Sequence, residues 1–146
     1  MKLLALALAA AAALAVPAAA MSDASQAAGV TLQVRSSAYG KILFDGRGYV
    51  LYAFSRDMKG KSNCSRRCAA RWPVYFAKGT LRAGSGVKQA LLGSTRRSDG
   101  KLQVTYAGRP LYHYIGDTRP GLILCQNVRE FGGLWLVVRA GGAVAK

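Results

Sequence analysis

The sequence predicts a mainly β domain, with an α+β arrangement as the alternative, in which two pseudo-equivalent β-hairpin repeats are separated by one short helix. Short runs of alternating apolar and polar residues, bounded by glycine-containing turns, recur along the chain and are typical of half-buried strands. Two segments match each other at one constant offset, the one that carries Tyr52 onto Tyr112. Only one segment combines capping residues, alanines and a terminating proline, as a helix does.

The first repeat spans about residues 40–64. Just before it, residues 31–34 alternate polar and apolar side chains and predict a strand. Residues 41–44 and 49–54 are rich in β-branched and aromatic residues and flank a turn that contains two glycines. This pattern predicts a β-hairpin.

The second repeat spans about residues 100–125 and has the same arrangement. Its predicted hairpin joins residues 101–106 to residues 109–114. The pairs that match at the constant offset, which we call the repeat offset, are Gly40 with Gly100, Lys41 with Lys101, Gly48 with Gly108, Leu51 with Leu111, Tyr52 with Tyr112, Phe54 with Tyr114 and Asp57 with Asp117. So many matches at one offset indicate an internal duplication, and two copies are too few for an open solenoid.

One helix is predicted between the repeats. Ser62 and Asn63 are suitable caps, residues 64–71 carry alanines and arginines, and Pro73 ends the run. A weaker pattern favours a second short helix around residues 87–92.

The N-terminus has the features of a secretory signal peptide. Lys2 precedes an unbroken apolar stretch over residues 3–16, and Pro17 is followed by three alanines that end at Ala20. The stretch is shorter than the roughly 20 apolar residues of a transmembrane helix. No cysteine lies near the cleavage site to carry a lipid. We therefore expect cleavage near Ala20, no transmembrane or lipid anchor, and a secreted or periplasmic mature protein.

The domain boundaries follow from changes in composition. After the signal peptide of residues 1–20, we expect a disordered lead-in over residues 21–29 and the folded domain over residues 30–140. Residues 134–138 predict a buried strand, and the glycine-rich residues 141–146 predict a flexible tail.

The chain is strongly basic, with 21 Lys and Arg against 6 Asp and Glu in 146 residues. Such a charge attracts polyanions, and an envelope polymer or lipid head groups are the partners we expect for an exported protein. A solvated basic surface with no dedicated partner is the alternative. No fold signature for specific nucleic-acid binding is present. The densest clusters, and therefore the anion-binding candidates, are Arg66, Arg67, Arg71, Arg96 and Arg97.

Both repeats contain the pattern Y-x-[FWY]-x-x-D, at residues 52–57 and 112–117. This pattern resembles that of a bacterial family of secreted repeats, often described as predicted lipoproteins of unknown function. Further similarity at residues 63–73, 91–93 and 132–135 extends the resemblance over nearly all of residues 40–138. The resemblance implies export and a repeat, without a biochemical role.

The six motif residues are the candidate site: Tyr52, Phe54 and Asp57 in the first repeat, and Tyr112, Tyr114 and Asp117 in the second. In each copy the two aromatic residues share one face of a strand, and the aspartate follows the strand end. We expect the aromatic pair to pack and the aspartate to accept backbone N–H groups in a turn. The alternative is a ligand face on which the tyrosine hydroxyls and both carboxylates converge near a pseudo-dyad.

The spacing of the three cysteines predicts which two of them form a disulfide. Cys64 and Cys68 are one helical turn apart, and an oxidising compartment favours a disulfide between them. Cys125 lies outside the repeat motif and is then the candidate free thiol. A bridge from Cys125 to either of the others and a metal site remain the alternatives. A soft-metal site would use the C-x-x-x-C pattern with His113 or Cys125 to hold Cu(I).

We predict no enzyme, no catalytic residue and no cofactor, because neither C-x-x-C-H nor G-x-S-x-G is present. The expected function is that of a non-enzymatic envelope module that binds an anionic surface polymer or lipid. The alternative is a periplasmic redox or metal-handling accessory protein.

Overall fold

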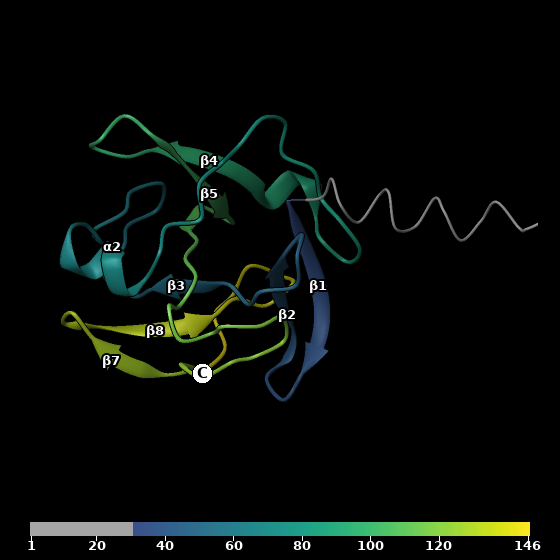
Figure 1. Ribbon diagram of the computed structural model, residues 1–146. Coiled ribbons are helices and arrows are strands. Elements are labelled where there is room, and N and C mark those ends of the chain that lie inside the picture. Colours follow the sequence, from purple (N-terminus) through teal and green to yellow (C-terminus); the bar gives the residue numbers. More distant parts are fainter. Residues whose placement is uncertain (1–30) are drawn as a thin grey trace, which may run out of the picture.

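The computed structural model describes residues 31–146, so the predicted signal peptide at residues 1–20 and the predicted lead-in at residues 21–29 lie outside the described residues. The elements are β1 (Leu32–Ser37), β2 (Gly40–Asp45), β3 (Tyr52–Phe54), α2 (Arg67–Arg71), a 3-10 helix η1 (Gln89–Leu91), β4 (Leu92–Arg96), β5 (Leu102–Tyr106), β6 (Arg109–Pro110), β7 (Val128–Glu130) and β8 (Gly133–Val137). Over residues 31–146, the prediction of a mainly β domain with one short α-helix is confirmed (Figure 1).

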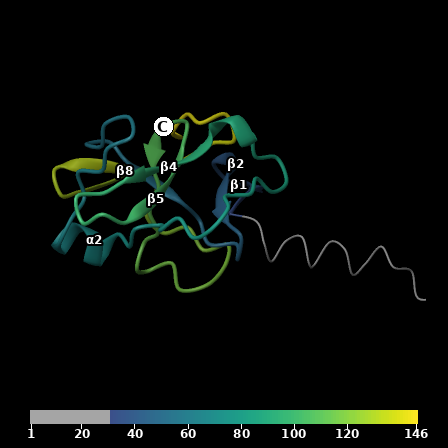
Figure 2. The same ribbon diagram turned by 90° about the horizontal axis from the view of Figure 1, so that it is seen from above.

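Three small antiparallel sheets form the domain. The first pairs β1 with β2, the second has the order β3-β8-β7, and the third has the order β4-β5-β6. The repeat offset carries the β1–β2 hairpin onto the β4–β5 hairpin, which shows the duplication in three dimensions. In both views the β1–β2 hairpin and α2 lie at opposite ends of the domain (Figures 1 and 2).

The first predicted hairpin is present only near its turn. There Asp45 N–H donates to Tyr49 O at 2.8 Å and Leu51 N–H donates to Leu43 O at 3.2 Å, which makes the isolated bridge from Phe44 to Val50. The main partner of β2 is β1. The following strand β3 instead pairs with β8, with Phe54 opposite Trp135. This pairing places the aromatic side chains of β3 among the other buried rings of the core. The second predicted hairpin is confirmed in a short form, β5 with β6.

The central helix is shorter than predicted and is not capped by Ser62 or Asn63. The helix α2 covers five residues, with Arg66 at its N-cap and no capping side-chain hydrogen bond. Ser62 and Asn63 are used elsewhere, because their polar groups bond to the motif residues Tyr112 and Asp57. The helix ends before Pro73 as expected, and the second helix is the single 3-10 turn η1.

The expectation of a flexible C-terminal tail is wrong. Val144 bridges to Val138, and Ala145 is buried in the core. The Gln126 side chain donates a hydrogen bond to the carbonyl oxygen of Ala145 at 2.9 Å. The glycines of this segment therefore let the chain turn back and pack against β8.

Two clusters of buried side chains make up the core. The larger contains most of the aromatic residues and all three cysteines, and the smaller is built mainly from aliphatic residues of the hairpins. The four aromatic motif residues lie in or against the larger cluster.

Candidate functional site

The two motif tyrosines lie side by side between the repeats. The N–H of Tyr52 donates to the carbonyl oxygen of Tyr112 at 2.9 Å, and the N–H of Tyr112 donates to the carbonyl oxygen of Tyr52 at the same distance. This reciprocal pair marks the pseudo-dyad between the two halves. Both tyrosine side chains are fully buried.

Each tyrosine hydroxyl binds the motif aspartate of the other repeat. The hydroxyl of Tyr52 donates to Asp117 Oδ2 at 2.7 Å, and the hydroxyl of Tyr112 donates to Asp57 Oδ2 at 2.7 Å. Burial and the neighbouring carboxylate raise the pKa of both hydroxyls, so they remain protonated donors. The two motifs thus form a crossed pair of hydrogen bonds that ties the halves together.

Both aspartates also accept a backbone N–H with their other carboxylate oxygen. Asn63 N lies 2.6 Å from Asp57 Oδ1, and Leu124 N lies 3.0 Å from Asp117 Oδ1. These donors are six and seven residues downstream, rather than in the adjacent turn that we expected. Each aspartate therefore closes a loop and anchors a tyrosine at once. The hydroxyls and carboxylates do converge, but they bind one another inside the core.

Two tryptophans, which the sequence did not suggest as a pair, lie at the centre of this arrangement. The rings of Trp72 and Trp135 stack with centroids 3.9 Å apart and planes 2° apart. Tyr52 meets Trp72 edge-on at 5.2 Å, and Tyr112 meets Trp135 in the same way at the same distance. The pair was missed because the repeat offset does not carry one tryptophan onto the other.

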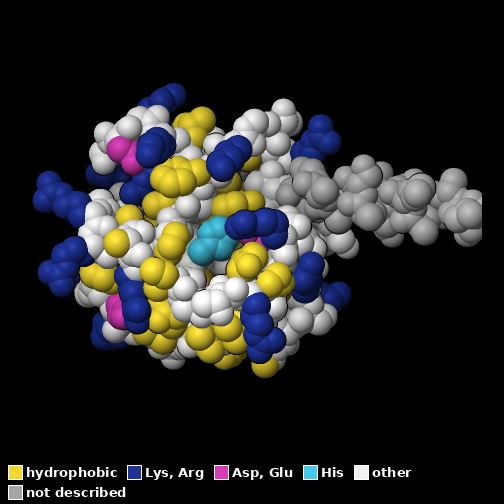
Figure 3. Space-filling model, in the orientation of Figure 1, with side chains coloured by type: hydrophobic (Ala, Val, Ile, Leu, Met, Phe, Trp, Pro, Cys, Tyr) yellow, Lys and Arg dark blue, Asp and Glu magenta, His cyan; other side chains and the backbone are white. Residues whose placement is uncertain are grey.

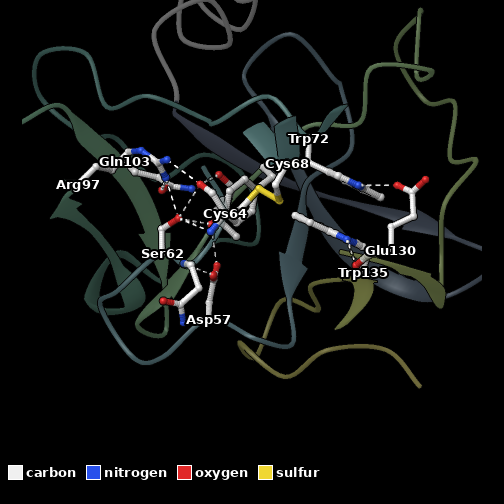
Figure 4. Close-up of a disulfide and its surroundings, with 12 residues drawn as sticks. Asp57, Ser62, Cys64, Cys68, Trp72, Arg97, Gln103, Glu130 and Trp135 are labelled. Atoms are coloured by element: carbon white, nitrogen blue, oxygen red, sulfur yellow. Dashed lines mark hydrogen bonds between the residues drawn. A yellow bond between two sulfur atoms is a disulfide. The ribbon is translucent and has the colours of Figure 1, made fainter. Parts of the chain in front are cut away.

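The other two motif aromatics complete the stack. Phe54 stacks on Trp135 at 4.3 Å, and Tyr114 packs on Trp72 at 4.9 Å, so each tryptophan contacts one ring from each motif. Glu130 holds both indoles, because its carboxylate accepts Trp72 Nε1 at 2.8 Å and its carbonyl oxygen accepts Trp135 Nε1 at 3.3 Å (Figure 4).

The predicted bridge between Cys64 and Cys68 is present, with the two Cα atoms 5.2 Å apart. The disulfide is buried in the aromatic cluster. Figure 4 shows it between the tryptophan pair and a group of polar side chains around Arg97.

The arginine in that group, Arg97, was expected at the surface as an anion-binding candidate, but its side chain is buried and its guanidinium is bonded inside the fold. Its side chain is only 7% exposed. Its guanidinium donates to Ser62 Oγ at 2.7 Å, to Gln103 Oε1 at 2.6 Å and to the carbonyl oxygen of Cys64 at 2.7 Å. The N–H donors of a guanidinium lie in one plane in a fixed arrangement, which suits several acceptors that the fold holds in place. Arg97 therefore joins the disulfide loop to the β5 strand.

The other four arginine candidates are exposed, and they do not form one cluster of free cations. Arg71 lies 3.6 Å from the Glu130 carboxylate and over the Tyr114 ring. Arg96 donates to the carbonyl oxygen of Gly100 at 2.8 Å. Arg66 and Arg67 are exposed at the start of α2.

The third cysteine, Cys125, is a buried free thiol, and burial raises its pKa. It directly follows Leu124, whose N–H bonds Asp117, just as Cys64 directly follows Asn63, whose N–H bonds Asp57. The expectation that Cys125 is not part of the repeat motif is therefore wrong, because it occupies the place of Cys64 in the second repeat. Among residues 31–146, no three His, Cys, Asp or Glu side chains are grouped so that they could hold a metal ion.

Comparison with known families agrees with this internal symmetry. A family model described as a secreted repeat of unknown function matches residues 33–75 and again residues 93–139. The chain belongs to this family. The two matched segments of the secreted-repeat protein begin at residues 33 and 93, which are related by the same offset as the two motifs. No curated protein and no solved structure matches. The description of the family as secreted agrees with the expected export.

Within the described part of the chain, the secreted-repeat protein has no helix that is both long and apolar enough to cross a membrane.

The disulfide of the secreted-repeat protein leads to a first prediction. Peptide mapping without reduction should recover Cys64 and Cys68 in one linked fragment, while Cys125 should react with an alkylating reagent only after denaturation, because it is buried. Replacing both bridged cysteines by alanine should lower the free energy of unfolding by less than about 3 kcal/mol, because the closed loop is short. A link from Cys125 to either partner would contradict this pairing.

A second prediction concerns the pH dependence of stability. Burial raises the pKa of Asp57 to about 6, despite its hydrogen bonds from Asn63 and Tyr112. Because this pKa is higher in the folded state than in the unfolded chain, protonation favours folding, and the contribution of Asp57 to stability should rise as the pH falls from 7 to about 4. We expect a change of about 1–3 kcal/mol. The measurement is the free energy of unfolding at both pH values.

The Asp57→Asn variant is the control for this effect, since it keeps an acceptor and removes the titration. It should lose most of the change that Asp57 causes, while the titration of Asp45 and Asp117 remains. If the pH profiles of the variant and the native protein coincide, Asp57 does not titrate in this range.

Proposed function

We propose that the domain is a non-enzymatic exported module that binds an anionic polymer or lipid head groups of the cell envelope. The proposal rests on how the charged side chains are distributed: nearly all the basic side chains are at the protein surface, whereas most of the acidic side chains are not. Of the 20 Lys and Arg in residues 31–146, 19 are exposed. Of the five Asp and Glu in the same range, only Asp99 is exposed.

The remaining four carboxylates are used inside the fold. Asp57 and Asp117 hold the motif tyrosines, and Glu130 accepts the indole of Trp72. Asp45 is buried and binds His113 at 3.1 Å. Internal use of the acids leaves few negative charges at the surface to offset the cations, and the field outside the protein is positive.

The exposed cations are spread over the surface. Figure 3 shows Lys and Arg side chains around the whole visible face, with few acidic side chains among them. A distribution of this kind suits a partner with many charges, such as a polymer or a membrane surface, because each cation adds a small and salt-sensitive attraction. The motif residues support a non-enzymatic role, because their hydroxyls and carboxylates already bind one another.

The test is binding of the mature protein to vesicles and polymers of defined charge. Sedimentation with vesicles that contain phosphatidylglycerol, and gel retardation with polyphosphate, should both show binding that falls steeply as salt is raised from low to physiological concentrations. Vesicles of phosphatidylcholine alone and a neutral dextran are the controls. Equal binding to the anionic and neutral probes, or no binding at low salt, would reject the proposal.

A further inference from the structure

In the described part of the chain, one open cleft combines a hydrogen-bonded carboxylate and imidazole with cations and aromatic rings. It has a volume of about 520 Å³ and lies beside the turn after β2 and the segment after α2. Its charged and aromatic lining residues are Asp45, Arg47, Tyr75, Phe76, Lys78 and His113. Figure 3 views this face, where the single histidine of the chain lies among basic and hydrophobic side chains.

At the cleft a carboxylate fixes an imidazole in place. Asp45 Oδ2 lies 3.1 Å from His113 Nε2, and Asp45 Oδ1 accepts the N–H groups of Arg47 and Tyr49 at 2.9 Å each. Burial would raise the pKa of Asp45, but the bonds from His113 and the backbone outweigh it, and the pKa lies below its usual range. The ionised carboxylate orients Nε2, and His113 Nδ1 makes no hydrogen bond to any residue from 31 to 146.

Cations and aromatic rings lie in and beside the cleft. The Arg47 side chain is 77% exposed, lies over the ring of Tyr49, and places its Nη2 3.4 Å from Asp45 Oδ2. Phe76 is 36% exposed, and the Lys101 ammonium lies 5.3 Å from its ring centre. The carboxylate that lines the cleft, that of Asp45, is buried and already bonded. The charge that a ligand meets in the cleft is therefore positive, and it lies beside the flat faces of aromatic rings.

The internal repeat provides a comparison for this cleft within the same molecule. The repeat offset relates His113 to Ala53, Arg47 to Ala107 and Asp45 to Thr105. Ala53 and Ala107 line a separate pocket of about 230 Å³. The carboxylate, imidazole and guanidinium of the cleft are thus absent from the equivalent positions of the other repeat. Since the other repeat folds without these three groups, the fold of a repeat does not depend on them.

We propose that this cleft binds an acidic saccharide, meaning a sugar unit that carries a carboxylate or a phosphate. The inference rests on the proposed function, since it names a site and a ligand class for the same envelope module. Arg47 and Lys78 pair with the acidic group. His113 Nδ1, the acceptor left when Nε2–H donates to Asp45, accepts a hydrogen bond from a sugar hydroxyl, and Phe76 and Tyr75 offer their rings to the apolar face of the sugar. A site that orients a small ligand typically combines a small number of well-placed polar groups with aromatic rings.

The test measures binding of oligogalacturonate, a phosphorylated mannose oligosaccharide, a neutral maltooligosaccharide and single-stranded oligothymidylate. At least one acidic saccharide should bind and should shift the imidazole resonances of His113, which are assigned at once because the chain has a single histidine. Of the two acidic oligosaccharides, the one that binds with the higher affinity shows whether a carboxylate or a phosphate is the preferred group. The neutral oligosaccharide should bind at least about tenfold more weakly.

Two variants with equal charge separate the cleft from the general basic surface. Arg47→Ala/Lys78→Ala should weaken binding of the acidic saccharide at least about tenfold, whereas Arg119→Ala/Arg129→Ala, which removes two exposed cations outside the cleft, should weaken it less than about threefold. His113→Gln should weaken binding without loss of the fold. Thermal unfolding of each variant checks that the fold is intact.

The remaining outcomes overturn the inference in distinguishable ways. Equal weakening by both double variants, with unshifted His113 resonances, would reject the cleft and leave the proposed function in place. Tighter binding of oligothymidylate at His113 would reject the ligand class. Absence of binding to every anionic probe, including the vesicles, would reject the proposed function itself.

Discussion

Replacing Trp135 with alanine should lower the free energy of unfolding by about 3–5 kcal/mol. The Trp135 side chain is fully buried and stacks on Trp72 at 3.9 Å and on Phe54 at 4.3 Å, with Tyr112 edge-on at 5.2 Å. Its removal leaves a cavity between the two halves that rigid ring neighbours cannot fill. Since a domain of this size is stable by only about 5–15 kcal/mol, the loss is a large fraction of the total.

Chemical denaturation followed by circular dichroism measures this effect. Phe131→Ala is a suitable control, because Phe131 is an aromatic residue of the same segment that is 45% exposed, and its loss should cost less than about 1 kcal/mol. If both variants are destabilised equally, the stacked tryptophans are not the main contact between the halves.

Tyr52→Phe should lower the free energy of unfolding by about 1–3 kcal/mol, although it removes a single oxygen. The lost hydroxyl is the donor to Asp117, whose side chain is buried and would keep only the N–H of Leu124 as a partner. A buried acceptor that loses its donor carries its full desolvation cost. Tyr49→Phe is the matched control, because Tyr49 is partly exposed and its hydroxyl makes no hydrogen bond within residues 31–146; it should change stability by less than about 0.5 kcal/mol.

A double-mutant cycle isolates the bond between the two repeats. Tyr52→Phe and Asp117→Asn should show a coupling free energy of about 1 kcal/mol or more, measured from urea unfolding of the native protein, both single variants and the double variant. Additive effects would mean that the hydroxyl and the carboxylate act independently, and the crossed motif would then not hold the halves together.

The crossed pairs give the motif a physical meaning. Each Y-x-[FWY]-x-x-D segment is incomplete by itself, because its tyrosine finds its acceptor, and its aspartate finds its hydroxyl donor, in the other segment. Two copies on one chain satisfy both needs inside one core. This arrangement explains why the repeat occurs as a pair here, and it leaves the surface free for another role.

The charge balance follows from the same arrangement. Asp57 and Asp117 are used in the crossed pairs, and Asp45 and Glu130 hold His113 and Trp72. Few carboxylates remain outside. The basic surface on which the proposed function depends is therefore a consequence of how the core uses its acids as well as of the number of Lys and Arg residues.

Features that depend on local spacing could be predicted from the amino-acid sequence. The period of two along a strand places Tyr52 and Phe54 on one face, and the i, i+4 spacing brings Cys64 and Cys68 together. The repeat offset identified the duplication, because matching side chains reflect matching backbone positions. Pro73 marked the end of the helix, because proline cannot continue its hydrogen bonds.

The contacts between distant groups depend on the tertiary structure. Whether β3 pairs with residues 41–44 or with β8 is a competition between long-range contacts of similar local pattern, and the aromatic core favours β8. The stacked tryptophans, the burial of Arg97 and the pair of Asp45 with His113 join residues that no periodicity relates. Such contacts depend on the summed packing and hydrogen bonding of the whole core, which local spacing along the chain does not specify.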